Sequence, residues 1–143
     1  MKLGLGSIGA LHDLSKCEDF PYPITEEEAQ FYCQEDGSLH THGIYHGSKL
    51  VSIMTATFYR VFPCNDSPDG KVVCISGAYT RPDFRHKGYA SMLLKEIEED
   101  ARAYGANYIC LDSTADDFYK RNGFKHAPSN ESRMWKRLTS TPA

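Results

Sequence analysis

The stretch VVCISGAYTRPDFRHKGYASMLLKEIEEDARAYG, residues 72–105, decides the fold of this chain. It opens with an apolar, β-branched run at residues 72–75, which is typical of a strand, and then turns through residues 80–83. Its second half places apolar side chains at helical spacing, at Tyr89, Leu93, Ile97, Ala101 and Tyr104. Residue 105 is a glycine, the residue that most often ends a helix in the left-handed conformation. The stretch therefore predicts a strand, a turn and a long amphipathic helix.

The join between this strand and this helix concentrates cationic side chains. Arg85, His86 and Lys87 precede Gly88, which has no Cβ, and the small Ala90 keeps the first helical turn thin. A helix N-terminus offers unpaired N–H groups and the positive end of the helix dipole, so it binds phosphate readily. Glycine would let the backbone come close to such an anion. From the spacing alone, an anion site and a basic turn at a solvated helix start are equally good interpretations.

The same residues carry a resemblance to a known family. The pattern Tyr79-Thr80-x-Pro82-x-x-Arg85-x-x-Gly88-x-Ala90, followed by a long amphipathic helix, resembles the acetyl-CoA motif of the GNAT superfamily of N-acetyltransferases. Further along, Phe118-Tyr119-Lys120-Arg121-Asn122-Gly123-Phe124 resembles the F-Y-x-K-x-G-F signature of that family. The two motifs occur in order, separated by one predicted helix and one predicted strand. The clear resemblance covers residues 72–127, with a weaker match through the C-terminus.

The resemblance implies a fold, an activity and a set of site residues. The fold is one α/β domain of GNAT type over residues 1–143, with a central mixed, mostly antiparallel sheet flanked by helices. The activity is transfer of an acetyl group from acetyl-CoA, the co-substrate, to a primary amine by direct attack on the thioester. By resemblance, the hydroxyl of Tyr119 faces the CoA sulfur and protonates the departing thiolate. The main chain that binds the pantetheine arm and thioester belongs to Ala78, Tyr79 and Thr80. The residues assigned to the pyrophosphate are Arg85, His86, Lys87, Gly88, Tyr89, Ala90 and Ser91.

Several functional questions stay open at this level. An amine is mostly protonated at neutral pH, so the reaction needs a base, and the central strand carries Cys74 and Ser76 where some relatives carry a carboxylate or histidine. A non-catalytic acyl-CoA-binding or regulatory module of the same fold is one alternative. A dinucleotide-binding domain is another, because residues 4–9 match G-x-G-x-x-G, but only residues 1–3 precede them as a strand. The acceptor could be a polyamine, an amino acid, an antibiotic, or a protein N-terminus or lysine.

Composition narrows the partners and the compartment. The net charge of −3 gives no electrostatic case for nucleic acid or an anionic membrane, and no apolar run approaches the length of a membrane span. We therefore expect an amine acceptor as partner, with a homodimer left open. The five cysteines are odd in number, scattered and free of any C-x-x-C pair, which suits reduced thiols in a cytoplasmic protein. The start of the chain predicts no signal peptide.

The remaining segments predict the following local structure. Residues 1–24 are rich in glycine and predict an irregular N-terminus that ends in an extended Pro21–Pro23 connector. Thr25 and Glu28 form a capping box that starts a helix to about Gln34. Further strands are expected at residues 50–61 and 108–111, and a short helix is expected to be capped by residues 114–117 and ended by a glycine at 123. Residues 124–127 and 133–138 are expected to pair antiparallel around a turn at residues 128–131, with Trp135 as a packing residue.

Three histidines invite a metal interpretation. His40, His42 and His46 alternate onto one face of an expected strand. No Cys, Asp or Glu completes the set at the usual ligand spacing, so we expect no metal and interpret these residues as polar positions on a half-exposed hairpin.

Overall fold

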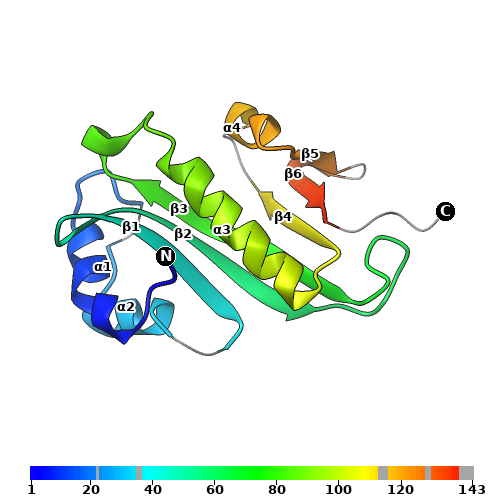
Figure 1. The fold of residues 1–143 in the computed structure, drawn as a ribbon, viewed down its shortest axis with the longest axis horizontal. Helices are drawn as coiled ribbons and strands as arrows, with labels where there is room; N and C mark the ends of the chain where they lie inside the picture. Colours follow the sequence, from blue (N-terminus) through cyan, green and yellow to red (C-terminus); the bar gives the residue numbers. More distant parts are fainter. Residues whose placement is uncertain (22, 35–36, 113–115, 128–129, 139–143) are drawn as a thin grey trace. The chain divides into compact units, whose positions relative to one another are not determined.

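The computed structural model describes residues 1–21, 23–34, 37–112, 116–127 and 130–138. Among these residues, six strands form one sheet in the order β1-β2-β3-β4-β6-β5. The β3–β4 pair is parallel, whereas β4–β6 and β6–β5 are antiparallel. Figure 1 shows the elements, whose order along the chain is η1 (Leu5–Ser7), α1 (Ile8–Leu14), α2 (Glu26–Tyr32), β1 (Leu39–His46), β2 (Lys49–Arg60), β3 (Lys71–Thr80), η2 (Pro82–Phe84), α3 (Tyr89–Tyr104), β4 (Tyr108–Asp112), α4 (Asp116–Arg121), β5 (Lys125–Ala127) and β6 (Asn130–Arg137). A mixed sheet with helices confirms the predicted α/β fold class.

The chain divides into two compact units. The first contains residues 1–56 and 77–97, and the second contains residues 57–76 and 98–143. The elements β2, β3 and α3 each contribute residues to both units. In the described part of the chain, no helix is long and apolar enough to cross a membrane.

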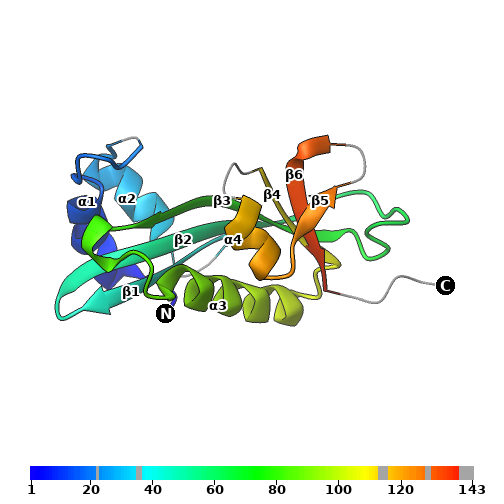
Figure 2. The ribbon, with the colours of Figure 1, turned by 90° about the horizontal axis from the view of Figure 1, so that it is seen from above.

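In the first unit, helices lie on both sides of the strands. Figure 2 shows α1 and α2 on one side of β1–β3 and the start of α3 on the other. The side with α1 and α2 buries a core made of Leu3, Leu11, Leu14, Ala29, Cys33, Leu50, Ile53 and Tyr79. The prediction of an irregular N-terminus is therefore wrong, because residues 8–14 form α1. Burial of Leu11 and Leu14 in this core stabilises a short helix whose own residues include an unfavourable glycine.

The predicted capping box at the start of α2 is confirmed. The Thr25 hydroxyl accepts a hydrogen bond from the Glu28 amide at 3.1 Å, and the Glu28 carboxylate accepts one from the Thr25 amide at 3.0 Å. Two of the amides that a helix start leaves unpaired thereby obtain partners. The helix ends at Tyr32, slightly before the predicted Gln34.

The long helix α3 follows its sequence prediction closely. Leu93, Ile97 and Ala101 of the apolar stripe are buried. At its end Gly105 has a φ of +85°, its amide donates to the Arg102 carbonyl, and the next amide donates to the Ala101 carbonyl. This pair of bonds is the Schellman motif, which requires a left-handed residue and therefore favours glycine.

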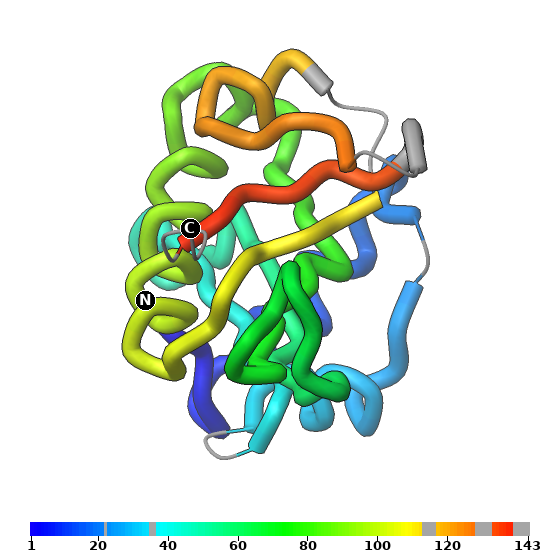
Figure 3. Tube along the Cα trace, turned by 90° about the vertical axis from the view of Figure 1, so that its right-hand side faces the viewer, coloured from blue at the N-terminus to red at the C-terminus, as the bar shows by residue number. Residues whose placement is uncertain are grey.

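In the second unit, β4 lies between β3 and β6, and β5 pairs with the outer side of β6 (Figure 3). The predicted antiparallel pair near the C-terminus is confirmed as β5 and β6, with Lys125 opposite Trp135. The Trp135 side chain is buried and packs edge-on against the Tyr108 ring at 5.3 Å, as a packing residue should. The predicted helix is α4, followed by Gly123 at a φ of +91°. The predicted turn at residues 128–131 is wrong for residues 130 and 131, which begin β6. Residues 128–129 of that turn and residues 114–115 of the predicted helix cap lie outside the described residues.

Candidate cofactor and catalytic site

The end of β3 offers exposed backbone. The register with β4 runs from Val72 opposite Tyr108 to Cys74 opposite Cys110, and β3 then continues to Thr80. Beyond Cys74, β3 has no strand partner on its β4 side among the described residues. Residues 76–78 are exposed. An extended backbone without a ladder partner can hydrogen-bond an extended ligand, which is what the resemblance expects of Ala78, Tyr79 and Thr80.

Side chains hold this strand end in place on its buried side. Tyr79 is only 8% exposed and belongs to the core beneath α1 and α2, where the Phe20 ring packs edge-on against it at 4.8 Å. The Thr80 hydroxyl lies 2.7 Å from that of Ser52 on β2. Because the Tyr79 ring lies in the core, only the main chain of this residue is accessible to a cofactor. This is the part of Tyr79 that the resemblance assigns to cofactor binding.

The predicted anion turn is an exposed run between η2 and α3. Arg85, His86, Lys87 and Gly88 are all exposed, and Tyr89 begins α3. The Gly88 carbonyl accepts the first helical bond, from the Met92 amide at 3.1 Å, so Gly88 is the N-cap. Met92 is the first donor to this helical bond pattern, so the amides of Tyr89 and Ala90 precede it at the positive end of the helix dipole.

Two residues of this turn have left-handed backbone. Gly88 has a φ of +83°, and a Cβ built on it would meet nothing within 4 Å. Glycine is thus needed there for its backbone conformation rather than for space. His86 has a φ of +62°, the only positive value among the described non-glycine residues. A non-glycine residue in this conformation is strained, and such strain is concentrated at ligand-binding turns.

The side chain of Arg85 makes hydrogen bonds within the chain. Its Nε donates to the Thr80 carbonyl at 2.8 Å, and its Nη2 donates to the Asp19 carboxylate at 2.5 Å. The other oxygen of Asp19 accepts a short hydrogen bond from the Tyr79 hydroxyl. The hydrogen bond from Tyr79 has the larger effect and that from Arg85 the next, and together they hold the pKa of Asp19 below its usual range. Asp19 is the contact that sequence reasoning missed: it lies 66 residues from Arg85, and no local pattern marks it.

A parallel contact fastens the start of the turn. Arg81 donates to the Leu50 carbonyl at 2.7 Å and to the Asp13 carboxylate at 3.1 Å. Its Nη1 also lies 3.2 Å from the Cys17 sulfur. Asp13 in α1 and Asp19 in the segment after α1 thus each supply a carboxylate to one of the two arginines that flank η2, and both residues of each pair belong to the first unit.

Tyr119, the predicted general acid, lies in α4 of the second unit. Its side chain is 7% exposed and packs edge-on against the rings of Phe118 at 4.9 Å and Phe124 at 5.6 Å. Burial raises its pKa, since the phenolate would lose its solvation. At neutral pH the hydroxyl is therefore protonated, which is the state that an acid requires.

The second unit also contains a pair of thiols next to the end of the β3–β4 register. Cys74 and Cys110 are register partners, and the Tyr59 hydroxyl lies 3.9 Å from the Cys110 sulfur. The hydrogen bond from the Cys74 thiol lowers the pKa of Cys110 to about 7. The same bond and burial raise the pKa of Cys74. Cys74 remains a neutral thiol and is not a base, which agrees with what its residue type suggested.

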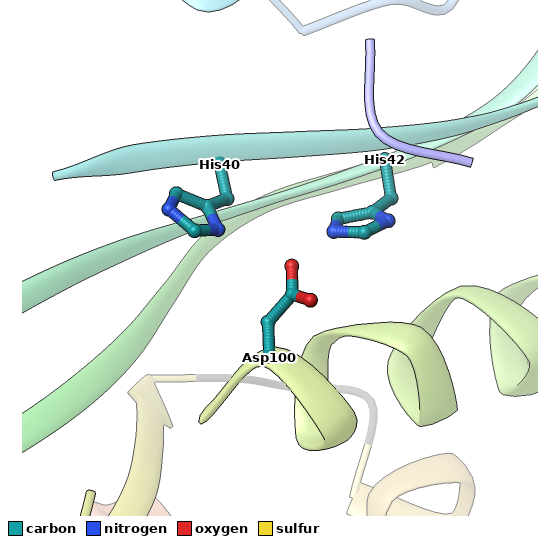
Figure 4. Close-up of side chains that lie close together, drawn as sticks. All are labelled: His40, His42 and Asp100. Atoms are coloured by element: carbon teal, nitrogen blue, oxygen red, sulfur yellow. The ribbon is translucent and has the colours of Figure 1, made fainter. Parts of the chain in front are cut away.

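Of the three histidines on β1, His40 is half-buried and His46 exposed, as the sequence predicted, but the prediction is wrong for His42. Figure 4 shows His40 and His42 projecting from the same side of β1; Asp100, the third side chain drawn, belongs to the other unit. His42 is buried, and its Nδ1 lies 2.9 Å from a carboxylate oxygen of Glu96 on α3. Burial opposes ionisation of Glu96, but hydrogen bonds from the Met1 amino group and from His42 prevail and lower its pKa. His42 is thus a core residue with a carboxylate partner, because α3 covers this side of β1.

Comparisons with known proteins agree with this geometry. The chain matches the sequence profile of the acetyltransferase (GNAT) family over residues 8–124, and it therefore belongs to that family. Among curated proteins, none matches the chain by sequence.

Solved structures share the fold. A predicted acetyltransferase from Clostridium acetobutylicum, solved with acetyl-CoA, is 19% identical, with a TM-score of 0.74 and 91% of each chain covered. The PaiA N-acetyltransferase from Thermoplasma acidophilum, in complex with coenzyme A, is 19% identical, with a TM-score of 0.67, 96% of this chain and 97% of that one covered. An aminoglycoside N-acetyltransferase in complex with CoA is 17% identical, with a TM-score of 0.70 and coverage of 91% and 93%. At these identities the likeness concerns the fold.

Proposed function

We propose that this chain is an acetyl-CoA-dependent N-acetyltransferase that acetylates a primary amine. Membership of the acetyltransferase family supports acetyl transfer in general. The observation that carries the cofactor assignment is the exposed run from Arg85 to Gly88, which ends at a left-handed N-cap glycine on a long helix. The positive dipole end of α3, a left-handed glycine that lets the backbone approach an anion, and the exposed Lys87 fit a diphosphate. No described residue of the turn carries a carboxylate other than Asp83, which precedes Arg85 in η2.

In the proposed reaction the neutral amine nitrogen forms a bond to the thioester carbonyl carbon, and the carbon–sulfur bond breaks. The departing thiolate takes its proton from the Tyr119 hydroxyl, the attacking nitrogen loses its proton to solvent, and solvent returns a proton to the Tyr119 phenolate. Main-chain amides near Ala78 to Thr80 polarise the carbonyl oxygen in the manner of an oxyanion hole. The raised pKa of Tyr119 supports its part, because its hydroxyl stays protonated at neutral pH and so has a proton to give to the thiolate.

The cytoplasm is the compartment that we propose. All five cysteines are free thiols, including the exposed Cys64. An exposed reduced thiol suits a reducing compartment.

The cofactor assignment is tested by thermal unfolding with two ligands. CoA should raise the melting temperature, whereas pantetheine, which lacks the diphosphate, should do so far less. A ligand at about a hundred times its dissociation constant stabilises the folded state by roughly 2.7 kcal/mol, a shift that is easily seen. NAD serves as a control for general nucleotide binding. Equal shifts from CoA and pantetheine would remove the diphosphate argument.

Catalysis is tested by release of free thiol from acetyl-CoA with a panel of amines. The panel should include a polyamine, amino acids, an aminoglycoside and a peptide with a free N-terminus. Thiol release that depends on one class of amine would support the enzyme and identify its acceptor. Stabilisation by CoA without thiol release from any amine would instead favour a non-catalytic acyl-CoA-binding module.

A further inference from the structure

The carboxylate of Asp19 binds the guanidinium group of Arg85, a residue that the resemblance assigns to the cofactor diphosphate. Its Oδ2 accepts from Arg85 at 2.5 Å, and its Oδ1 accepts from the Tyr79 hydroxyl. The positive charge of Arg85 is therefore balanced by a carboxylate of the chain itself. The guanidinium also lies over the Tyr79 ring, 5.5 Å from its centroid, so its position is well defined.

The two bonds of Asp19 differ in their surroundings. The Arg85–Asp19 pair is open to solvent, with side chains 40% and 46% exposed. Exposed ion pairs contribute little to stability and exchange readily. Tyr79, in contrast, is buried, and the Phe20 ring next to Asp19 in the chain packs against it. The segment after α1 thus has a firm anchor at Phe20 and Tyr79 and an exchangeable contact at Arg85.

We propose that Asp19 is an internal substitute for a cofactor phosphate, and that a phosphate of the bound cofactor takes its place on Arg85. This inference rests on the proposed function. A guanidinium binds carboxylate and phosphate with the same planar arrangement of donors, so one anion can replace the other on it. The Nε bond from Arg85 to the Thr80 carbonyl does not involve Asp19 and would hold the side chain in place during the exchange.

The exchange has two consequences. Cofactor binding must compete with Asp19, so the affinity for a phosphate-bearing ligand is lower than the turn alone would give. The segment between α1 and α2 also loses its contact with Arg85 when the cofactor binds, whereas its contacts with Tyr79 and Arg81 remain.

The first experiment measures CoA affinity by calorimetry in Asp19→Asn and in a matched control, Asp13→Asn. Asparagine keeps the size of Asp19 and an acceptor for Tyr79 but removes the charge that competes for Arg85. The control removes the equivalent carboxylate from Arg81, which precedes η2. We expect Asp19→Asn to bind CoA about two- to fivefold more tightly, the scale of one exposed ion pair, and Asp13→Asn to bind it as the wild type does. Weaker or unchanged binding by Asp19→Asn, or an equal gain in Asp13→Asn, would overturn the inference.

The second experiment uses the wild-type chain, so it does not depend on a variant that folds. Amide hydrogen exchange of residues 15–20 should become faster when CoA saturates the protein and should stay the same with pantetheine. Unchanged or slower exchange with CoA would overturn the exchange of anions on Arg85. If CoA does not bind the wild type at all, the proposed function itself fails, whereas binding without these effects sinks only the role of Asp19.

Discussion

Substitution of Gly88 tests whether the turn before α3 holds the cofactor diphosphate. Two variants separate the two effects of a side chain at this position. Gly88→Ala adds a Cβ, and Gly88→Asp adds a Cβ with a carboxylate. Because a Cβ here would meet nothing within 4 Å, neither variant creates a clash with the rest of the chain.

The cost to stability comes from the backbone. Gly88 has a φ of +83°, and a non-glycine residue in the left-handed region loses about 1–2 kcal/mol. For a chain of this size that loss lowers the melting temperature by roughly 3–8 °C. Aspartate is ordinarily favoured at an N-cap, but with extended backbone, so this benefit does not follow at a left-handed N-cap. Both variants should therefore fold and be destabilised by similar amounts.

The effect on affinity should separate the two variants. A carboxylate about 5 Å from one phosphate charge is repelled by about 1–3 kcal/mol, depending on the effective dielectric constant between about 80 and 20. That range corresponds to a dissociation constant roughly 5- to 150-fold weaker in Gly88→Asp than in Gly88→Ala. Calorimetric titration of both variants with CoA measures this ratio. A ratio below about twofold, in folded protein, would mean that the turn does not hold the phosphates.

Three further predictions concern the acid, the strained turn and the carboxylate that reaches it. Tyr119→Phe should lower kcat by about tenfold to a thousandfold with little change in the KM for acetyl-CoA, and it should alter the free energy of unfolding by no more than about 1 kcal/mol; a wild-type kcat would assign the acid elsewhere. His86→Gly should raise the free energy of unfolding by about 1 kcal/mol in denaturant titrations, since glycine relieves the φ of +62°, whereas His86→Ala should bring no such gain. The Tyr79 hydroxyl and Arg85 lower the folded-state pKa of Asp19, and the Cys17 thiol lies next to that hydroxyl. The charge of Asp19 therefore stabilises the folded state above the pKa of the unfolded carboxyl group. This stabilisation is lost as the pH falls through the pKa of the folded state. The stability difference between wild type and Asp19→Asn should accordingly disappear in acid; a difference that persists there would show that the charge of Asp19 is not its cause.

Local sequence determined the elements around the cofactor turn and their order. The capping box at Thr25 and Glu28, the apolar stripe of α3 and the helix end at Gly105 depend on residues at most a few positions apart. Such signals concern hydrogen bonds and side-chain faces within one element, so they can be interpreted without knowledge of the rest of the chain. The motif at residues 79–90 belongs to the same kind, because one strand end and one helix start build the whole turn.

Tertiary structure alone decided which distant groups meet this turn. The helix α1 forms in a glycine-rich segment because Leu11 and Leu14 are buried beneath the sheet, a gain that no local propensity predicts. His42 changes from an expected surface position to a buried partner of Glu96 because α3 covers that side of β1. Asp19 reaches Arg85 only because Phe20 packs on Tyr79 and brings the connector after α1 to the end of β3. The free energy of each of these contacts depends on burial and on charges far away in sequence, and these exist only once the chain has folded.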